Sequence, residues 1–172
     1  MKKVLALFVC VGLLLSSTLV YAQSTKIGFV DLQRILRESK RAIKEQDAFK
    51  KKQDEKNKEV SKKEEELMAL KESFEKKIAS GMLSEQARRD MEREYQQKVR
   101  DYEYFKRDVG IELQKIYQEI NIKLLNSINT VVTKLGEEGN YTLVLEASVV
   151  AYASEGLDIT DQVIKAFDAA KE

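Results

Sequence analysis

The chain has 172 residues, of which 30 are basic and 29 acidic, and it contains no Pro, His or Trp and a single Cys, Cys10. Because Cys10 lies in an N-terminal segment that we expect to be removed, this composition excludes Ser/His and Cys/His nucleophilic catalysis, zinc bound by His or Cys, and a disulfide framework. Charged residues make up 34% of the sequence, compared with about 25% in an average globular domain. A dense mixture of both signs without Pro is typical of long solvated helices. We therefore expect neither an enzyme nor a bound metal or cofactor.

Residues 1–22 have the organisation of a signal peptide. Lys2 and Lys3 precede an apolar run over residues 4–15, and Val20-Tyr21-Ala22 suits a signal peptidase. We expect cleavage after Ala22, which leaves an exported chain, residues 23–172, with 28 basic and 29 acidic residues and a net charge of −1. An uncleaved membrane anchor is the first alternative, but the apolar run is shorter than the roughly 20 residues that span a bilayer. A lipoprotein signal is the second, but no small residue precedes Cys10.

The mature chain opens with a short strand and a long helix. Residues 26–30 are apolar and β-branched, as in a strand, and Asp31 is placed to cap a helix that begins at Leu32. No Gly or Pro interrupts the sequence from there to Ala79. Because Val60 is the only apolar residue between Lys50 and Glu66, this helix cannot belong to a globular core and must extend into solvent or form a sparse coiled coil.

A break over residues 79–84 separates this helix from a second one. Gly81 can end a helix in the left-handed conformation, and Ser84 can cap the next. The second helix is predicted to run to about Leu135, with apolar residues at steps of three and four: Val109, Leu113, Ile116, Ile120, Leu124, Ile128, Val131 and Leu135. Two such helices would form an antiparallel hairpin about 65–75 Å long.

The C-terminal residues complete a small body. Residues 141–146 and 149–153 are predicted strands, and Thr160 is predicted to cap a last helix. The fold class is therefore α+β, mostly α, with a helical hairpin (37–135) inserted in a β body (23–36 and 136–172). A body of about 50 residues rarely buries a sufficient core alone, so we expect it to oligomerise. The candidate residues for this body are Ile27, Phe29, Leu143, Leu145, Val149, Tyr152, Ile159 and Phe167.

Two segments connect this organisation to a known family. KIGFVDLQRIL opens the mature chain (26–36) and YTLVLEASVVAYASEGLDITDQVIKAF closes it (141–167). With the signal and the charged hairpin, they resemble the Skp (OmpH) family of periplasmic chaperones. The resemblance implies a periplasmic homotrimer in which three subunits build one small β-barrel body. Three helical tentacles would then enclose unfolded outer-membrane β-barrel proteins, without ATP. That family is strongly basic, whereas this mature chain is not.

The function expected from this reading is that of a chaperone that holds unfolded chains. The client-contact candidates are apolar and aromatic residues towards the hairpin tip: Met68, Met82, Leu83, Met91, Tyr95 and Tyr102. Packing between the two helices is the other interpretation of these side chains. Lipid or lipopolysaccharide is a further possible partner that the chain would contact weakly. Nucleic acid is not an expected partner. A structural coiled-coil spacer or adaptor in the cell envelope is the alternative function.

Overall fold

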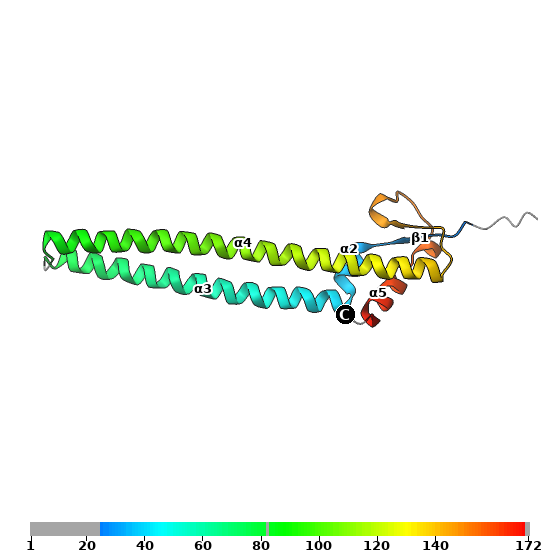
Figure 1. Ribbon diagram of the computed structural model, residues 1–172, viewed down its shortest axis with the longest axis horizontal. Coiled ribbons are helices and arrows are strands. Elements are labelled where there is room, and N and C mark those ends of the chain that lie inside the picture. The colour runs from blue at the N-terminus through cyan, green and yellow to red at the C-terminus, as the bar shows by residue number, and fades with distance from the viewer. Residues whose placement is uncertain (1–24, 82, 171–172) are drawn as a thin grey trace, which may run out of the picture.

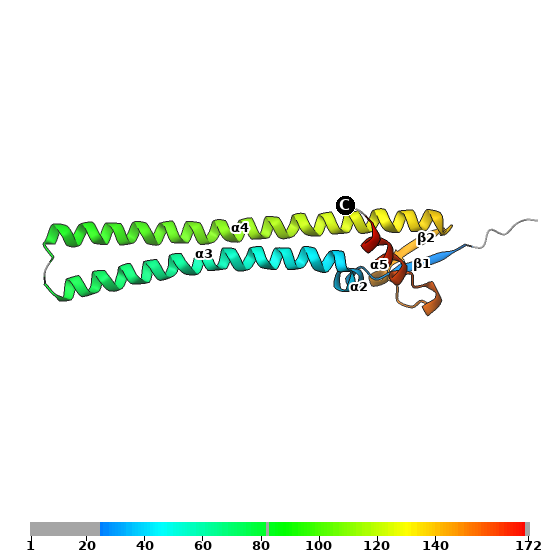
Figure 2. The same ribbon diagram turned by 90° about the horizontal axis from the view of Figure 1, so that it is seen from below.

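The computed structural model describes residues 25–81 and 83–170. The predicted signal peptide and its cleavage site lie outside these residues. Two long antiparallel helices form an arm that projects from a small body, and both ends of the described chain lie in that body (Figures 1 and 2). Within the described ranges, no helix is long and apolar enough to cross a membrane.

The arm consists of α3 (Lys40–Ala79) and α4 (Glu85–Glu138). At the tip, Gly81 adopts a positive φ of 65° and ends the first helix, and the Ser84 hydroxyl accepts a hydrogen bond from the Ala87 N–H to begin the second. Both predicted signals are thus confirmed. At about 1.5 Å per residue, the helices are about 60 and 80 Å long.

The packing of the arm becomes sparser towards its tip. The buried residues of α4 are Tyr102, Val109, Leu124 and Ile128, and α3 contributes only Ala42. Two ion pairs between the helices share one antiparallel register: Lys56 with Glu112 and Lys123 with Glu45, each at 2.9 Å. The hydrogen bond from Lys56 to Glu112 raises the pKa of the Lys56 ammonium, despite partial opposition from desolvation. Between Tyr102 and the tip, no described residue of the arm is buried, so the distal end of the arm has few fixed tertiary contacts.

The body is built around a two-stranded parallel sheet, β1 (Ile27–Val30) paired with β2 (Leu143–Glu146). Helix α2 (Leu32–Glu38) begins at Asp31, whose carboxylate accepts a hydrogen bond from the Arg34 N–H as predicted. The last helix, α5 (Thr160–Ala169), packs against α4 and α2. The core combines both ends of the chain with the root of the arm: Val30, Ile35, Ala42, Leu124, Ile128, Ile159, Val163 and Phe167.

Three predicted details are corrected by the structure. The first helix is not continuous, because Ser39 adopts an extended conformation (φ −67°, ψ 130°) and separates α2 from α3. Residues 149–153 form no strand; Val149 ends a short 3-10 turn (Ala147–Val149) and the residues after it are irregular. A strand needs a hydrogen-bonded neighbour, and none in the described chain pairs with this segment. Thr160 does not cap α5 but is its first residue; the N-cap position is Ile159, which makes no side-chain cap hydrogen bond, and the Asp158 carboxylate accepts from the Thr160 N–H at 2.8 Å.

We expect Phe167→Ala to be strongly destabilising. Phe167 is fully buried, and removing a buried aromatic ring costs about 3–5 kcal/mol through lost contacts and a residual cavity. Urea unfolding followed by circular dichroism at a fixed protein concentration measures this loss. Phe49→Ala is the control, because Phe49 is only half-buried in the arm beside Tyr117. Equal losses of unfolding free energy in the two variants would show that the body core contributes no more to stability than the arm does.

Candidate functional site

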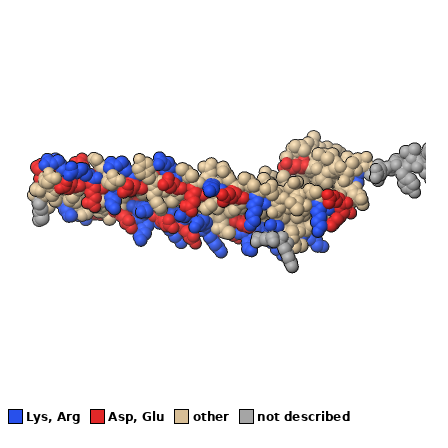
Figure 3. Space-filling view, in the orientation of Figure 1, with Lys and Arg blue, Asp and Glu red and all other residues tan. Residues whose placement is uncertain are grey.

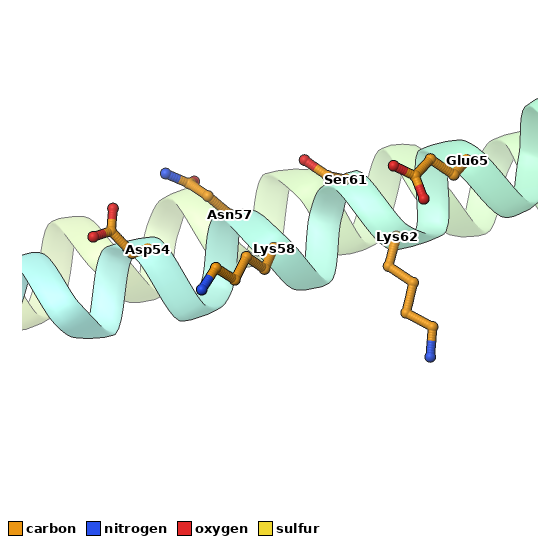
Figure 4. Close-up of a pocket in the computed structure, with 6 residues that line it drawn as sticks. All are labelled: Asp54, Asn57, Lys58, Ser61, Lys62 and Glu65. Carbon is orange, nitrogen blue, oxygen red and sulfur yellow. The ribbon is translucent and has the colours of Figure 1, made fainter.

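The surface depressions found along the described arm and at its root are open to solvent. One shallow surface depression is lined by six polar residues of α3 that spread along its outer face, among them Asp54, Asn57 and Glu65 (Figure 4). Two Lys residues lie between an acidic residue at each end, and one solvated helix supplies all of these groups. Among the described residues, no cluster of His, Cys, Asp or Glu is arranged to hold a metal ion. The surfaces that could bind a partner are instead apolar and extended.

The first such surface is the outer face of the sheet. Residues alternate along β1, so that Gly28 and Val30 face the core while Ile27 and Phe29 face away from it. In the register, Ile27 lies opposite Leu143 and Phe29 opposite Leu145, which gives two apolar pairs on the same open face. Parallel sheets almost always have both faces covered. Nearby on the body, Val149 is 73% and Tyr152 88% exposed.

The second surface lies on α4, on the side turned away from α3. We call it the α4 stripe and define it as Tyr104, Ile111, Ile122 and Leu125, which are 43–59% exposed. Their spacings of 7, 11 and 3 residues place them on one face of the helix. The polar residues Asp108, Lys115 and Gln118 interrupt the same face and are exposed. The stripe is therefore discontinuous, unlike the seam of a stable coiled coil.

The residues predicted as client contacts have different environments in the structure. Met68 is 66% exposed, whereas Tyr102 is 8% exposed and its hydroxyl has no hydrogen-bond partner in the described part of the chain. Leu83, Met91 and Tyr95 are half-buried, and Met82 lies outside the described residues. The candidates therefore do not form one continuous surface.

The body candidates divide into two groups. Ile159 and Phe167 belong to the core of the chain itself, at 3% and 0% exposure. Ile27, Leu143, Val149 and Tyr152 are exposed, and Phe29 and Leu145 are half-buried on the open sheet face.

The α4 stripe is the feature that the sequence reading missed. The sequence does contain a signal for it. The apolar residues at steps of three and four from Val109 to Leu135 belong to the inner seam, and Ile111, Ile122 and Leu125 are apolar residues of the same segment that lie outside that seam. Apolar residues left over on a solvated helix face indicate a second contact surface.

Charges of both signs are mixed on the face of the arm that Figure 3 shows. In Figure 3, basic and acidic residues alternate along its whole length, while the upper part of the body in this view is mostly uncharged. Ion pairs of opposite sign recur along the helices, such as Lys76 with Glu72 at 2.7 Å. Exposed pairs of this kind contribute at most about 1 kcal/mol each. They keep the arm soluble and provide no surface of a single sign for a charged ligand.

These features define an elongated, mostly helical protein whose exposed apolar residues lie on extended surfaces. Comparison with known proteins identifies its family: residues 26–167 match the model described as Outer membrane protein (OmpH-like). The chain therefore belongs to the OmpH-like family, which confirms the resemblance seen in the sequence. This family is a non-enzymatic class, in agreement with the prediction that the chain is not an enzyme.

Two individual relatives illustrate the similarity. Outer membrane protein 26 of Haemophilus influenzae is 42% identical over 50 residues, which are 29% of this chain and 25% of that protein. A solved structure described as an outer membrane chaperone (OmpH-like) from Caulobacter crescentus CB15 superposes with a TM-score of 0.79. It covers 84% of this chain and 85% of that one at 17% sequence identity, so it supports the mostly helical fold with two short strands.

Proposed function

We propose that this protein is an ATP-independent periplasmic chaperone that sequesters unfolded outer-membrane β-barrel proteins and prevents their aggregation. The α4 stripe carries this proposal, because it presents apolar side chains to solvent along a long arm without forming a continuous seam for one folded partner. Unfolded β-barrel strands expose apolar side chains and unpaired backbone groups, which associate with other chains. Several weak apolar contacts can hold such a chain and still release it. Membership of the OmpH-like family, and the description of a similar solved structure as an outer membrane chaperone, support the same function.

We propose further that the chain acts as a homotrimer joined through the body. The support is the open face of the parallel sheet, where Ile27 and Leu143 are 38% and 47% exposed, and the exposed Val149 and Tyr152 beside it. A second copy that covers this face would complete a core that a body of this size rarely provides alone. Strands from three subunits would then close one small barrel, from which three arms project around a shared space.

The client surface that we propose has two parts on each arm. The tip part contains the candidates predicted from the sequence: Met68, Met82, Leu83, Met91, Tyr95 and Tyr102. The second part is the α4 stripe. Among the described residues, the stripe provides four half-exposed apolar side chains, whereas Met68 is the tip candidate with the greatest exposure. We therefore expect the stripe to contribute more to client binding than the tip.

Light scattering separates this function from that of a structural spacer. A urea-unfolded outer-membrane β-barrel protein is diluted into buffer without detergent, with and without the chain expressed from residue 23. A chaperone that sequesters its client suppresses the scattering when the two are present in comparable amounts. A spacer or adaptor with one folded partner leaves the scattering unchanged, and that result would refute the proposed function.

We expect client binding to depend only weakly on salt. The mature chain carries a net charge of −1, and the stripe is apolar, so screening removes little of the attraction. The screening length shortens from about 10 Å at 0.1 M to about 3 Å at 1 M salt. Fluorescence titration with an unfolded outer-membrane protein should therefore give a Kd that changes less than about tenfold over this range. A larger rise would indicate capture by charge.

A further inference from the structure

The root of the arm is attached to the body in two different ways. Helix α4 continues without interruption from the arm into the body, where it packs against α5. Helix α3 instead meets α2 at the extended residue Ser39, which is completely buried. We call this junction between α2 and α3 at Ser39 the elbow. The backbone can bend there, because the helical hydrogen bonds of α2 end at Ser39 and those of α3 begin at it. One local hydrogen bond spans the junction, from the Gln46 side-chain amide of α3 to the Leu36 carbonyl of α2 at 3.1 Å. Further contacts come from a distant part of the chain.

Asp168, near the end of α5, provides those contacts. Its carboxylate accepts hydrogen bonds from the Ser39 hydroxyl at 2.6 Å and from the backbone N–H groups of Arg41 and Lys40 at 3.1 and 3.2 Å. The Ser39 hydroxyl in turn accepts from the Ala42 N–H at 3.2 Å. The first N–H groups of α3 have no partner within their own helix, and here a residue 127–128 positions away in the sequence satisfies two of them.

Neighbouring groups strengthen the same attachment. The Arg41 guanidinium lies 4.8 Å from the centre of the Phe167 ring, so Ser39 and the first residues of α3 contact two consecutive residues of α5, Phe167 and Asp168. Burial of the Asp168 carboxyl acts to raise its pKa, but the hydrogen bonds from Ser39, Arg41 and Lys40 and the charge of Lys40 outweigh it. The pKa of Asp168 therefore lies below its ordinary value, and the carboxylate is charged at neutral pH.

We propose that Asp168 is a latch that docks the first turn of α3 onto the body. While the latch is closed, both helices of the arm are fixed at their root. When it opens, the first turn of α3, which includes the core residue Ala42, can move at Ser39 while α4 stays anchored. The two helices can then change their spacing without unfolding of the rest of the body. For a chaperone this would adjust the arm to clients of different size, but the latch itself does not depend on the proposed function.

Hydrogen exchange tests the latch. In Asp168→Ala, amides of residues 40–43 should exchange about 2- to 30-fold faster, since loss of a helix cap lowers the stability of the first turn by an amount that corresponds to this change in rate. Amides in the body-facing part of α4 should be unchanged. Asp47→Asn is the matched control, because it removes an exposed carboxylate from the first turns of α3 without touching the elbow.

A distance measurement provides the second readout. Spin labels at Lys51→Cys in α3 and Lys165→Cys in α5, in chains diluted with unlabelled protein, should give a broader distance distribution when Asp168→Ala is added. A pair at Lys134→Cys in α4 and Lys165→Cys should not change. Unaltered exchange and distances at the elbow would overturn the proposal. Faster exchange throughout α4 and α5 would also overturn it, because Asp168 would then be a residue of general body stability.

Discussion

Leu143→Glu is expected to convert the trimer to monomers at micromolar concentration. Leu143 is 47% exposed in the single chain and lies opposite Ile27 on the open face of the sheet. In the proposed trimer this face is covered, so the variant would bury a carboxylate without a partner in every subunit. An unpaired buried charge costs several kcal/mol, and the penalty applies once for each copy. Sedimentation velocity measures the resulting mass.

The control for this variant is Gln162→Glu, which makes the same change in charge on the exposed side of α5. It should assemble as the unmodified chain does, and circular dichroism should show the same helix content for both variants. A Leu143→Glu chain that retains the mass of the unmodified protein would contradict assembly through the sheet face.

Replacing the four residues of the α4 stripe with Gln is expected to weaken client binding by at least tenfold. Each apolar contact of this kind is worth about 1 kcal/mol, and the stripe contributes four on every arm. Because these side chains are 43–59% exposed and Gln is a good helix former, the arm should remain folded. Fluorescence titration with an unfolded outer-membrane protein measures the change, with circular dichroism as the check on helix content.

The matched comparison is a tip variant with Met82, Leu83 and Met91 replaced by Gln. We expect it to bind clients more weakly than the unmodified chain but more tightly than the stripe variant. If the stripe variant binds normally and the tip variant does not, the client surface lies at the tip and the stripe has another role.

The features predictable from sequence were those with a local physical cause. Asp31 and Ser84 cap helices through their own neighbours, and Gly81 adopts the left-handed conformation that other residues avoid. The arm follows from a stretch of sequence with too few apolar residues to form a core. Each of these signals acts within a few residues of the structure that it specifies, so one sequence suffices to interpret it.

The features that could not be predicted depend on distant residues. Ser39 lies in a sequence that reads as continuous helix, and the group that stabilises its break comes from Asp168, 129 positions away. Residues 149–153 have the composition of a strand, but composition does not supply the neighbouring strand that pairing requires. The α4 stripe could be identified only once the buried side of α4 was known. Three of its residues lie two positions from a buried residue, Tyr102, Val109 or Leu124, and therefore on the opposite side of the helix.

Native mass spectrometry of the chain expressed from residue 23, mixed with a urea-unfolded outer-membrane β-barrel protein, tests the central claim most directly. It reports assembly and client capture in a single spectrum. We expect a trimer in the absence of client and a complex of three chains with one client in its presence. A chain that remains monomeric, or a trimer that forms no complex with the unfolded protein, would contradict it.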